Sequence, residues 1–131
     1  MSNRIINMTG HYLQFDDLFS FFYVTIIRNE VRELLVDGEI IECAFMTVRD
    51  QVIFTDKRIF VVNVQGFTGK KVSYISYPYS KVQYYGIQTA GVWDIDSELI
   101  LAFNNGAVLQ FDFKTAVDIT MLNNLISKYV L

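Results

Sequence analysis

The strongest constraint on this chain is its long central region, residues 41–113, where short apolar segments are separated by turn residues. Several of these segments alternate between apolar and polar side chains, which is the period of a β-strand. Asp56-Lys57 and a glycine-bearing loop at 65–71 separate neighbouring segments, and Asn104-Asn105-Gly106 favours a type I′ hairpin turn. We therefore predict seven strands, at residues 41–48, 51–55, 58–64, 72–77, 82–89, 98–103 and 107–113. Seven short strands in succession indicate a sandwich or a barrel, and a barrel would hide its strand edges.

A segment with helical periodicity precedes the predicted strands. Residues 1–14 show no sustained pattern, and we expect them to be a loose lead-in. Residues 15–37 carry apolar side chains at the i, i+3, i+4 spacing of a helix, and Gly38 suits the left-handed position after a helix end. The β-branched cluster at residues 24–27 has modest helix propensity, so a break into two helices stays open.

Residues 115–131 are predicted to form a C-terminal helix. Thr115 and Asp118 resemble a capping box, with Asp in place of the usual Glu or Gln. The helix is apolar over much of its circumference, whereas one sheet covers only one stripe of a helix. We therefore expect it to touch something besides its own sheet. Its main apolar face comprises Ile119, Leu122, Leu125, Ile126, Tyr129 and Val130.

The composition points to a second apolar contact. Hydrophobic residues make up 52% of the chain and charged residues 19%, which is richer in apolar side chains than an ordinary domain. One small core does not need so many, so we expect some to be buried against another subunit. The net charge of −3 argues against nucleic acid as a partner and weakly against an anionic membrane surface.

Single cysteine and histidine residues limit the chemistry that this chain can perform. Cys43 has no partner for an intrachain disulfide, which favours a cytoplasmic location. His11 alone makes a histidine metal cluster impossible and histidine-dependent catalysis improbable, and we expect no catalytic residue, metal or cofactor. The N-terminus lacks the apolar run of a signal peptide, and no stretch reaches the roughly 18 apolar residues of a membrane span.

Several strings in the chain resemble the bacterial pleckstrin-homology (PH) family. The most specific are QGFTGKKVSYIS at residues 65–76 and TAGVWDIDSEL at 89–99, joined by LLVDGE at 34–39 and FTDKR at 54–58. The resemblance implies a mainly β fold, a PH-like seven-stranded, partly open barrel with a C-terminal capping helix and an added N-terminal helix. Residues 15–131 would form this single domain, with helical segments at 15–37 and 115–131 and the barrel at 39–113. Members of the family resemble ring-forming homo-oligomers.

The candidate ligand residues are four basic side chains, Lys57, Arg58, Lys70 and Lys71. If they lie at one end of the barrel, they could bind phosphate. Eukaryotic relatives hold inositol phosphates with basic residues around the loop between the first two strands. Here that loop, Arg49-Asp50, sets one base beside one acid. We favour the alternative that the lysines are solvated turn residues and that the arginine holds its hairpin by local hydrogen bonds.

Three other groups of residues have both a functional and a structural interpretation. Asp94, Asp96 and Glu98 would share one side of a strand and could bind Ca²⁺, but they lack the remaining ligands of a calcium loop, so we favour a polar loop. Cys43 is best explained as a small buried hydrophobe. Aromatic and helical residues could form an interface or pack within the chain, and the candidates are Phe22, Ile26, Tyr84, Trp93, Leu122, Ile126 and Tyr129.

The predicted helix at 15–37 could lie on a membrane or against another subunit. Its polar face mixes acidic residues with Arg28 and Arg32, whereas membrane-surface helices are usually rich in Lys and Arg there. We favour packing on a neighbouring copy. The sequence therefore predicts a non-catalytic module that assembles with itself through helices and strand edges. The alternative is a module that binds a phosphoinositide-like headgroup or a peptide at the membrane surface.

Overall fold

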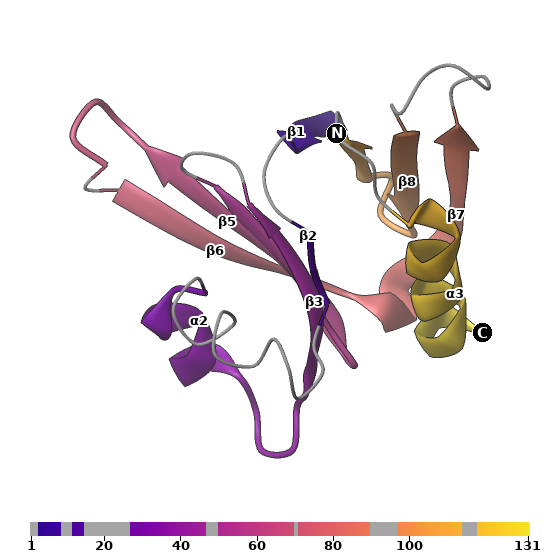
Figure 1. The fold of residues 1–131 in the computed structure, drawn as a ribbon, viewed down its shortest axis with the longest axis horizontal. Coiled ribbons are helices and arrows are strands. Elements are labelled where there is room, and N and C mark those ends of the chain that lie inside the picture. The colour runs from indigo at the N-terminus through magenta and orange to yellow at the C-terminus, as the bar shows by residue number, and fades with distance from the viewer. Residues whose placement is uncertain are drawn as a thin grey trace. The chain divides into compact units, whose positions relative to one another are not determined.

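The chain forms two compact units (Figure 1). The computed structural model describes residues 3–8, 12–14, 27–46, 50–69, 71–89, 97–113 and 118–131. One unit, unit 1, comprises Met1–Thr9 and Pro78–Leu131, and the other, unit 2, comprises Gly10–Tyr77. The chain therefore passes from one unit to the other at two positions, residues 9–10 and residues 77–78.

Unit 2 contains a five-stranded sheet and a short helix. The sheet has the order β2-β3-β4-β5-β6, so strands that follow one another in the chain are neighbours. Helix α2 spans Asn29–Leu34 and precedes β3. In Figure 1, β5 and β6 form a long hairpin, with α2 on one side of the sheet. The strand bounds are Tyr12–Gln14, Ile41–Met46, Gln51–Thr55, Arg58–Gln65 and Lys71–Pro78.

The middle of the unit 2 sheet is buried on both faces. All five residues of β4 are buried, which explains why its centre, Val52–Phe54, is apolar at successive positions rather than alternating with polar residues. On one face, Ile27 and Val31 join a cluster that includes Phe60 of β5. Helix α2 is only six residues long, too short to be stable by itself in water. Its stability therefore comes from inserting Val31, which is fully buried, into this cluster.

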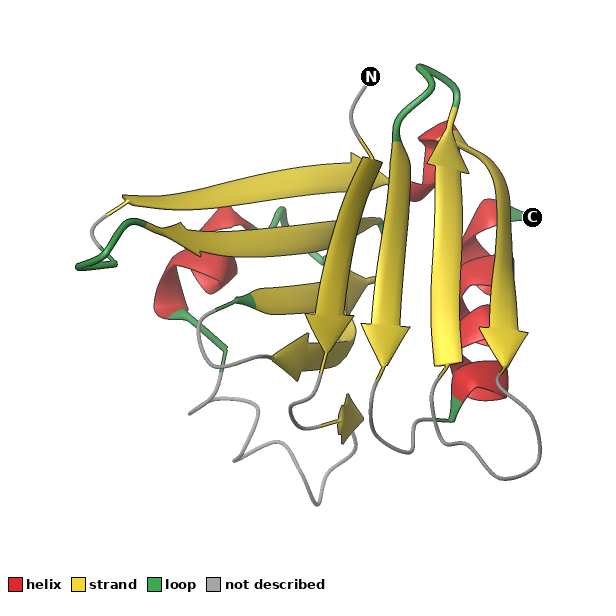
Figure 2. Cartoon of the chain, turned by 90° about the horizontal axis from the view of Figure 1, so that it is seen from above, coloured by secondary structure: helices red, strands yellow, loops and turns green. Residues whose placement is uncertain are grey.

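Unit 1 contains a four-stranded sheet in the order β1-β9-β8-β7 (Figure 2). The chain enters it through the short 3-10 helix η1, Tyr79–Lys81, and ends in helix α3, Ile119–Val130. Neighbouring strands from β7 to β9 are antiparallel, whereas β1 is parallel to β9. The strand bounds are Asn3–Met8, Val82–Thr89, Ser97–Phe103 and Val108–Phe113.

Helix α3 covers one face of the unit 1 sheet and closes its core. Its side chains Leu122 and Ile126 are fully buried. The Tyr85 hydroxyl of β7 lies 2.6 Å from the Ser127 Oγ atom, and the ring of Tyr79 stacks on Tyr129 at 5.5 Å between centroids. These contacts fix the helix against η1 and β7 of its own chain.

The predicted strands are confirmed with small changes at their ends. The segments at 51–55 and 82–89 agree with β4 and β7, and those at 58–64, 72–77, 98–103 and 107–113 are shifted by one residue at one or both ends. The predicted segment at 41–48 is observed over Ile41–Met46; its last two residues lie outside the described part. The fold class is therefore mainly β, with sheets that are antiparallel apart from the β1–β9 pair, and a C-terminal helix. Hydrogen bonding among the described strands leaves two separate sheets, as a partly open barrel requires.

The prediction of a loose lead-in at residues 1–14 is wrong. Asn3–Met8 forms a strand beside β9, and Tyr12–Gln14 forms a strand beside β3. Each segment therefore extends one of the two sheets at an edge. Such pairing depends on a distant strand, so no local periodicity reveals it.

The predicted helix at 15–37 is described only from residue 27 onward, where the helix covers Asn29–Leu34. Leu35 is already extended, so Gly38 does not end the helix. Gly38 has a φ of 80° in the reverse turn that follows, where the Glu39 N–H donates to the Val36 carbonyl over 3.0 Å. The left-handed conformation was predicted correctly, but it belongs to a turn that directs the chain into β3.

Two other local predictions need correction. Among the described residues no non-glycine residue has a positive φ, so Asn105-Gly106 is not a type I′ turn; only Gly106, at 90°, is left-handed. The Phe103 carbonyl accepts from the Gly106 N–H, and the Phe103 N–H donates to the Ala107 carbonyl. The C-terminal helix begins at Ile119, because Asp118 is its N-cap and accepts from the Met121 N–H over 3.0 Å. Thr115, the predicted start of a capping box, lies outside the described residues.

Within the described part of the chain, no helix is long and apolar enough to cross a bilayer.

Candidate functional site

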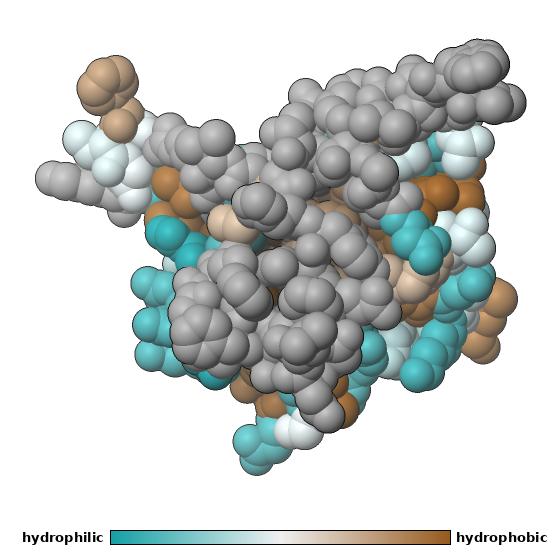
Figure 3. All heavy atoms as spheres, viewed as in Figure 1, coloured by the Kyte–Doolittle hydropathy of each residue, from teal (hydrophilic) through white to brown (hydrophobic). Residues whose placement is uncertain are grey.

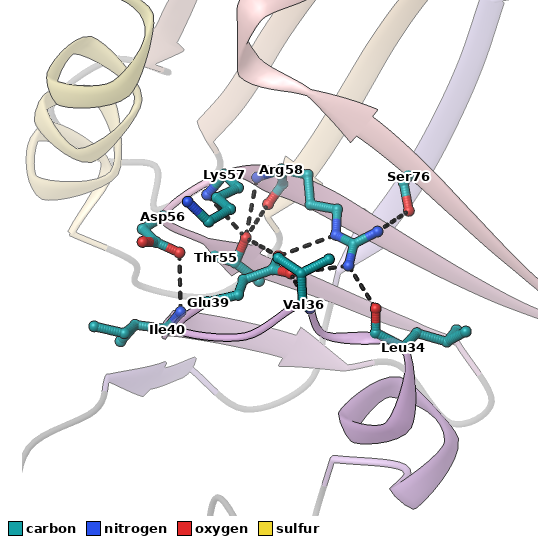
Figure 4. Close-up of polar contacts among 9 residues, drawn as sticks. All are labelled: Leu34, Val36, Glu39, Ile40, Thr55, Asp56, Lys57, Arg58 and Ser76. Carbon is teal, nitrogen blue, oxygen red and sulfur yellow. Dashed lines mark hydrogen bonds and ion pairs between the residues drawn. The ribbon is translucent and has the colours of Figure 1, made fainter.

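An internal ion pair fixes the loop that joins helix α2 to strand β3. The Glu39 carboxylate accepts from the Arg58 guanidinium at two atoms, Nη2 over 2.8 Å and Nε over 3.0 Å (Figure 4). The Glu39 side chain is fully buried, and that of Arg58 is 20% exposed. Because the two contacts are nearly parallel, they fix the direction of both side chains as well as their charge.

Thr55 connects this ion pair to the turn of the β4–β5 hairpin. Its hydroxyl donates to the Glu39 Oε2 atom over 2.7 Å and accepts from the backbone N–H groups of Lys57 and Arg58, both at 3.0 Å. Thr55 is fully buried, so its hydroxyl needs these partners. The string FTDKR therefore folds into a hairpin turn whose threonine also orients the glutamate.

Arg58 extends the network to two further elements. Its Nη2 atom donates to the Leu34 carbonyl at the end of α2 over 2.6 Å, and Nη1 donates to Ser76 of β6 over 3.1 Å. The guanidinium carbon lies 4.1 Å from the centre of the Phe60 ring, which is cation–π geometry. One side chain thus joins α2, β5 and β6, and four of its five N–H donors are already used.

The network sets the pKa of Glu39. Burial would raise this pKa, but hydrogen bonds from Arg58, Thr55 and the Val36 N–H, together with the Arg58 charge, lower it below its ordinary value of 4.5. The carboxylate is therefore ionised at neutral pH and acts as a structural anchor.

The backbone of the loop is held by further hydrogen bonds. The Val36 N–H donates to the Glu39 Oε1 atom over 3.0 Å, the Ile40 N–H donates to Asp56 over 2.9 Å, and the Asp56 N–H donates to the Ile40 carbonyl over 2.9 Å. The loop is thereby fixed at several points. It nevertheless presents three aliphatic side chains to solvent, Leu34, Val36 and Ile40, which are 47%, 54% and 61% exposed.

The four predicted ligand residues do not form a group in the described part of the chain. Arg58 binds Glu39, and Lys57 is exposed in the turn just before β5. Lys71 begins β6, the returning strand of the hairpin, at the end remote from the turn that carries Lys57. Lys70 lies outside the described residues. Only the backbone of Arg58 holds the hairpin, through Thr55; its side chain donates to Leu34, Glu39 and Ser76 on other elements, so the expected local contact of the side chain is not what the structure shows. Whether the lysines bind a ligand stays a prediction.

The predicted acidic group and the cysteine have structural surroundings. Glu98 on β8 accepts from the Gln110 side chain over 3.2 Å, and Asp94 and Asp96 lie outside the described residues. Among the described residues, no group of three or more His, Cys, Asp or Glu side chains is placed to hold a metal ion. Cys43 is fully buried, and burial followed by the nearby Glu42 charge raises the pKa of its thiol. A thiol in this setting is a poor nucleophile.

The predicted interface residues separate into three groups. Leu122 and Ile126 are fully buried in their own chain, so the prediction that they face another subunit is wrong. Tyr129 is half-buried against Tyr79, with the Lys128 Nζ atom 5.3 Å from its ring centre. Tyr84 is 60% exposed on β7 and is available for contact. Phe22, Ile26 and Trp93 lie outside the described residues.

Sheet edges provide the other candidate surface. Strand β7 is the last strand of the unit 1 sheet, and in the described part of the chain it pairs only with β8. It is eight residues long, VQYYGIQT, and has no charged residue and no proline. Its pairing with β8 shifts register between Val82 and Tyr84, but from Tyr84 to Thr89 it has none of the charged residues or prolines that usually prevent pairing with another chain.

Sequence reasoning missed the Glu39–Arg58 pair and the exposed loop beside it. The two charges are 19 positions apart, and buried charges are rare, so nothing in the sequence pairs them. The signal available in the sequence was the pair of strings LLVDGE and FTDKR. Each contains one charged residue that its turn does not require, Glu39 in the first and Arg58 in the second.

Antiparallel sheets followed by a C-terminal helix define a PH-like domain. A family model described as Bacterial PH domain matches residues 19–130. The chain belongs to the bacterial PH domain family.

Relatives with known structures have the same fold. A DUF1696 family protein with a pleckstrin-homology domain from Shewanella loihica PV-4 has a TM-score of 0.75 and 29% identity, covering 93% of this chain and 99% of that chain. A pleckstrin homology domain from Shewanella amazonensis SB2B has a TM-score of 0.64 and 34% identity, covering 90% of this chain and 91% of that chain.

The uncharacterized protein YjqA of Bacillus subtilis (strain 168) is similar in sequence. It is 45% identical over 73 residues, which are 56% of this chain and 58% of YjqA.

Proposed function

We propose that this chain is a non-catalytic PH-like module that associates with itself into a homo-oligomer, with a ring as its closed form. Strand edges and exposed loop surfaces provide the contacts. The C-terminal helix contributes only its half-buried side chains, because Leu122 and Ile126 are already used in the core of unit 1.

The observation that carries the proposal is the edge strand β7. Its eight residues contain no charge or proline, and Tyr84 stands 60% exposed on it. Unpaired backbone groups along such an edge pair readily with a strand of another chain. Tyrosine is also enriched in the centre of protein interfaces. The composition, 52% hydrophobic, supplies the additional apolar surface that an assembly would bury.

Mass measurement under native conditions tests the proposal. Light scattering is read across a dilution series of the full chain and of a Tyr84→Lys variant, which places a charge on the edge without removing a core side chain. The matched control is Thr120→Lys, the same charge change on the exposed side of α3. We expect the parent chain and the control to share one oligomeric mass and Tyr84→Lys to shift toward the monomer. A parent chain that remains at 15.2 kDa at every concentration would refute the proposal.

A further inference from the structure

The β5–β6 hairpin of unit 2 ends in an exposed tip, which we call the arm and define as the described residues 63–69 and 71–73. Strand β4 pairs with β5 only as far as Val62, opposite Gln51, so β5 continues beyond it. At the tip, Gly66 and Gly69 have φ values of 80° and 68°, and the Gly69 N–H donates to the Gly66 carbonyl over 3.3 Å. The two glycines therefore make a tight turn that places Phe67 at its outer end.

The side chain of Phe67 packs against nothing in the part of the chain that the structure describes. Its exposed fraction is 105%, higher than that of the other exposed large apolar side chains. Figure 3 shows an apolar side chain at the extremity of this hairpin, at the upper left as in Figure 1. An aromatic side chain buries a large apolar area when it enters a pocket. A turn that holds an aromatic ring exposed in this way is suited to insert that ring into another surface.

A surface of suitable chemistry lies at the other end of the same unit. We call it the patch and define it as Leu34, Val36 and Ile40, the three exposed aliphatic residues of the loop that Glu39 and Arg58 hold. Because the backbone of this loop is fixed by hydrogen bonds, the patch is formed before any partner arrives. A preformed surface loses little conformational entropy on binding.

The described charge on the arm and the acidic charges beside the patch are opposite in sign. Residues 63–73 include no Asp or Glu, and exposed Lys71 follows the tip of the arm by two residues. Exposed Arg32 and Lys57 also lie near the patch, so Glu33 and Asp37 carry the contrast. Exposed Glu33 and Asp37 flank the patch, and neither has an ion-pair partner in the described part of the chain. Complementary charges of this kind favour one orientation of two surfaces.

The arm and the patch of one copy cannot meet. The patch is tied to the first residue of β5, through the contacts of Arg58 with Leu34 and Glu39. The tip follows the last residue of this eight-residue strand, and a strand rises by about 3.3 Å per residue, so the two ends are roughly 23 Å apart. Both surfaces can therefore be satisfied only between different copies.

We propose that the arm of one copy inserts Phe67 into the patch of a second copy, with Lys71 facing Glu33 and Asp37. This inference rests on the proposed self-association and specifies the contact. The two surfaces differ, so the contact is head-to-tail, and repeating it closes a ring if the rotation between copies permits.

A complementation experiment tests this polarity. Phe67→Ser disables the arm and leaves the patch, whereas Val36→Lys disables the patch and leaves the arm. We expect each variant alone to associate at least tenfold more weakly than the parent chain. Both variants are also made in the Tyr84→Lys background, which weakens the β7 contact proposed above. Mixed in equal amounts in that background, they should form a one-to-one complex of about twice 15.2 kDa, since one competent arm meets one competent patch. Thr68→Ser on the arm and Asn29→Lys on α2 are the matched controls and should behave as the parent chain. All four positions are exposed, and thermal unfolding followed by circular dichroism verifies that each variant is folded.

A charge exchange provides a second measurement. Lys71→Glu and Asp37→Lys should each weaken association several-fold, and a chain that carries both should recover to within about twofold of the parent, because every copy then has a reversed arm and a reversed patch.

The outcomes separate this inference from the function on which it rests. A monomeric parent chain would remove both. An oligomeric parent chain with unchanged arm and patch variants, or variants that do not form a mixed complex, would overturn the arm contact and leave self-association through β7 in place. If Phe67→Ser instead abolishes sedimentation with phosphatidylglycerol vesicles and leaves the oligomeric mass unchanged, the arm serves a lipid surface and the contact between copies is refuted.

Discussion

Replacing Glu39 by glutamine should destabilise the chain far more than its small change in shape suggests. The carboxylate accepts four hydrogen bonds, from two atoms of Arg58 and from Thr55 and the Val36 N–H. A glutamine has one acceptor oxygen, so its NH₂ group would face either Arg58 Nη2 and the Val36 N–H or Arg58 Nε and the Thr55 hydroxyl. The first orientation loses two hydrogen bonds. The second loses the Arg58 Nε contact, because the Thr55 hydroxyl can turn to donate to the Arg58 carbonyl instead. In both orientations Arg58 loses its charged partner.

The magnitude follows from these contacts and their burial. Hydrogen bonds to charged groups contribute about 1.5–3 kcal/mol each, and breaking a buried ion pair costs about 3–5 kcal/mol. Arg58 keeps 20% of its side-chain surface exposed, so water can solvate part of the released guanidinium and the cost should lie at the lower limit. We expect Glu39→Gln to lower the free energy of unfolding by about 3 kcal/mol.

Urea unfolding followed by circular dichroism measures this loss. Glu30→Gln is the matched control: it makes the same substitution on an exposed side chain of α2 and should cost less than about 0.5 kcal/mol. Arg58→Met completes a double-mutant cycle, in which we expect a coupling energy of about 2 kcal/mol. Each titration is repeated at tenfold higher protein concentration, so that changes in association are recognised. A Glu39→Gln variant as stable as the control would show that the pair contributes nothing and would refute the reasoning.

Three further predictions concern pH, capping and ligand binding. Because the folded-state pKa of Glu39 is lowered from 4.5, its contribution is present above about pH 4.5 and is lost as the pH falls through the folded-state value; acid titration of stability should show a smaller slope below that pH in Glu39→Gln than in the parent chain. Asp118→Ala removes the N-cap contact to the Met121 N–H and should cost about 1 kcal/mol in thermal unfolding, whereas Asp118→Asn should cost less. A Lys70→Glu/Lys71→Glu variant and the parent chain should sediment equally poorly with phosphoinositide vesicles; salt-sensitive binding by the parent that the variant loses would instead establish the ligand-binding alternative.

The strands were predictable because their signals are local. β7 and β4 have the apolar, β-branched and aromatic residues of strands, and turn residues stand on both sides of them. The N-cap shows the limit of local reasoning: Thr115 and Asp118 both suit that position, and packing of Ile119 and Leu122 into the core decides for Asp118. The wide apolar face of α3 also predicted a contact outside its own sheet, although that sheet buries the apolar side chains Leu122 and Ile126.

The candidate site could be predicted much less well, because it joins residues far apart in the chain. Arg58 was considered as a ligand residue, and its partner Glu39 was not considered at all. Their contact needs the turn at Gly38 to bring the loop over the β4–β5 hairpin, and no periodicity encodes that placement. Phe67 was noted only as part of the string QGFTGKK. Its significance comes from complete exposure, which a sequence does not state.

The parallel pairing of β1 with β9 has a consequence for how the chain folds. Asn3 lies opposite Val108, a separation of 108 − 3 = 105 residues, so β1 pairs with a strand that is made long after it. Closing so long a loop carries an entropy cost and slows folding. Strand β1 therefore cannot pair until β9 exists, and the edge of β9 that it covers stays open to other chains until β1 reaches it. In this sense β1 is a late lock on unit 1.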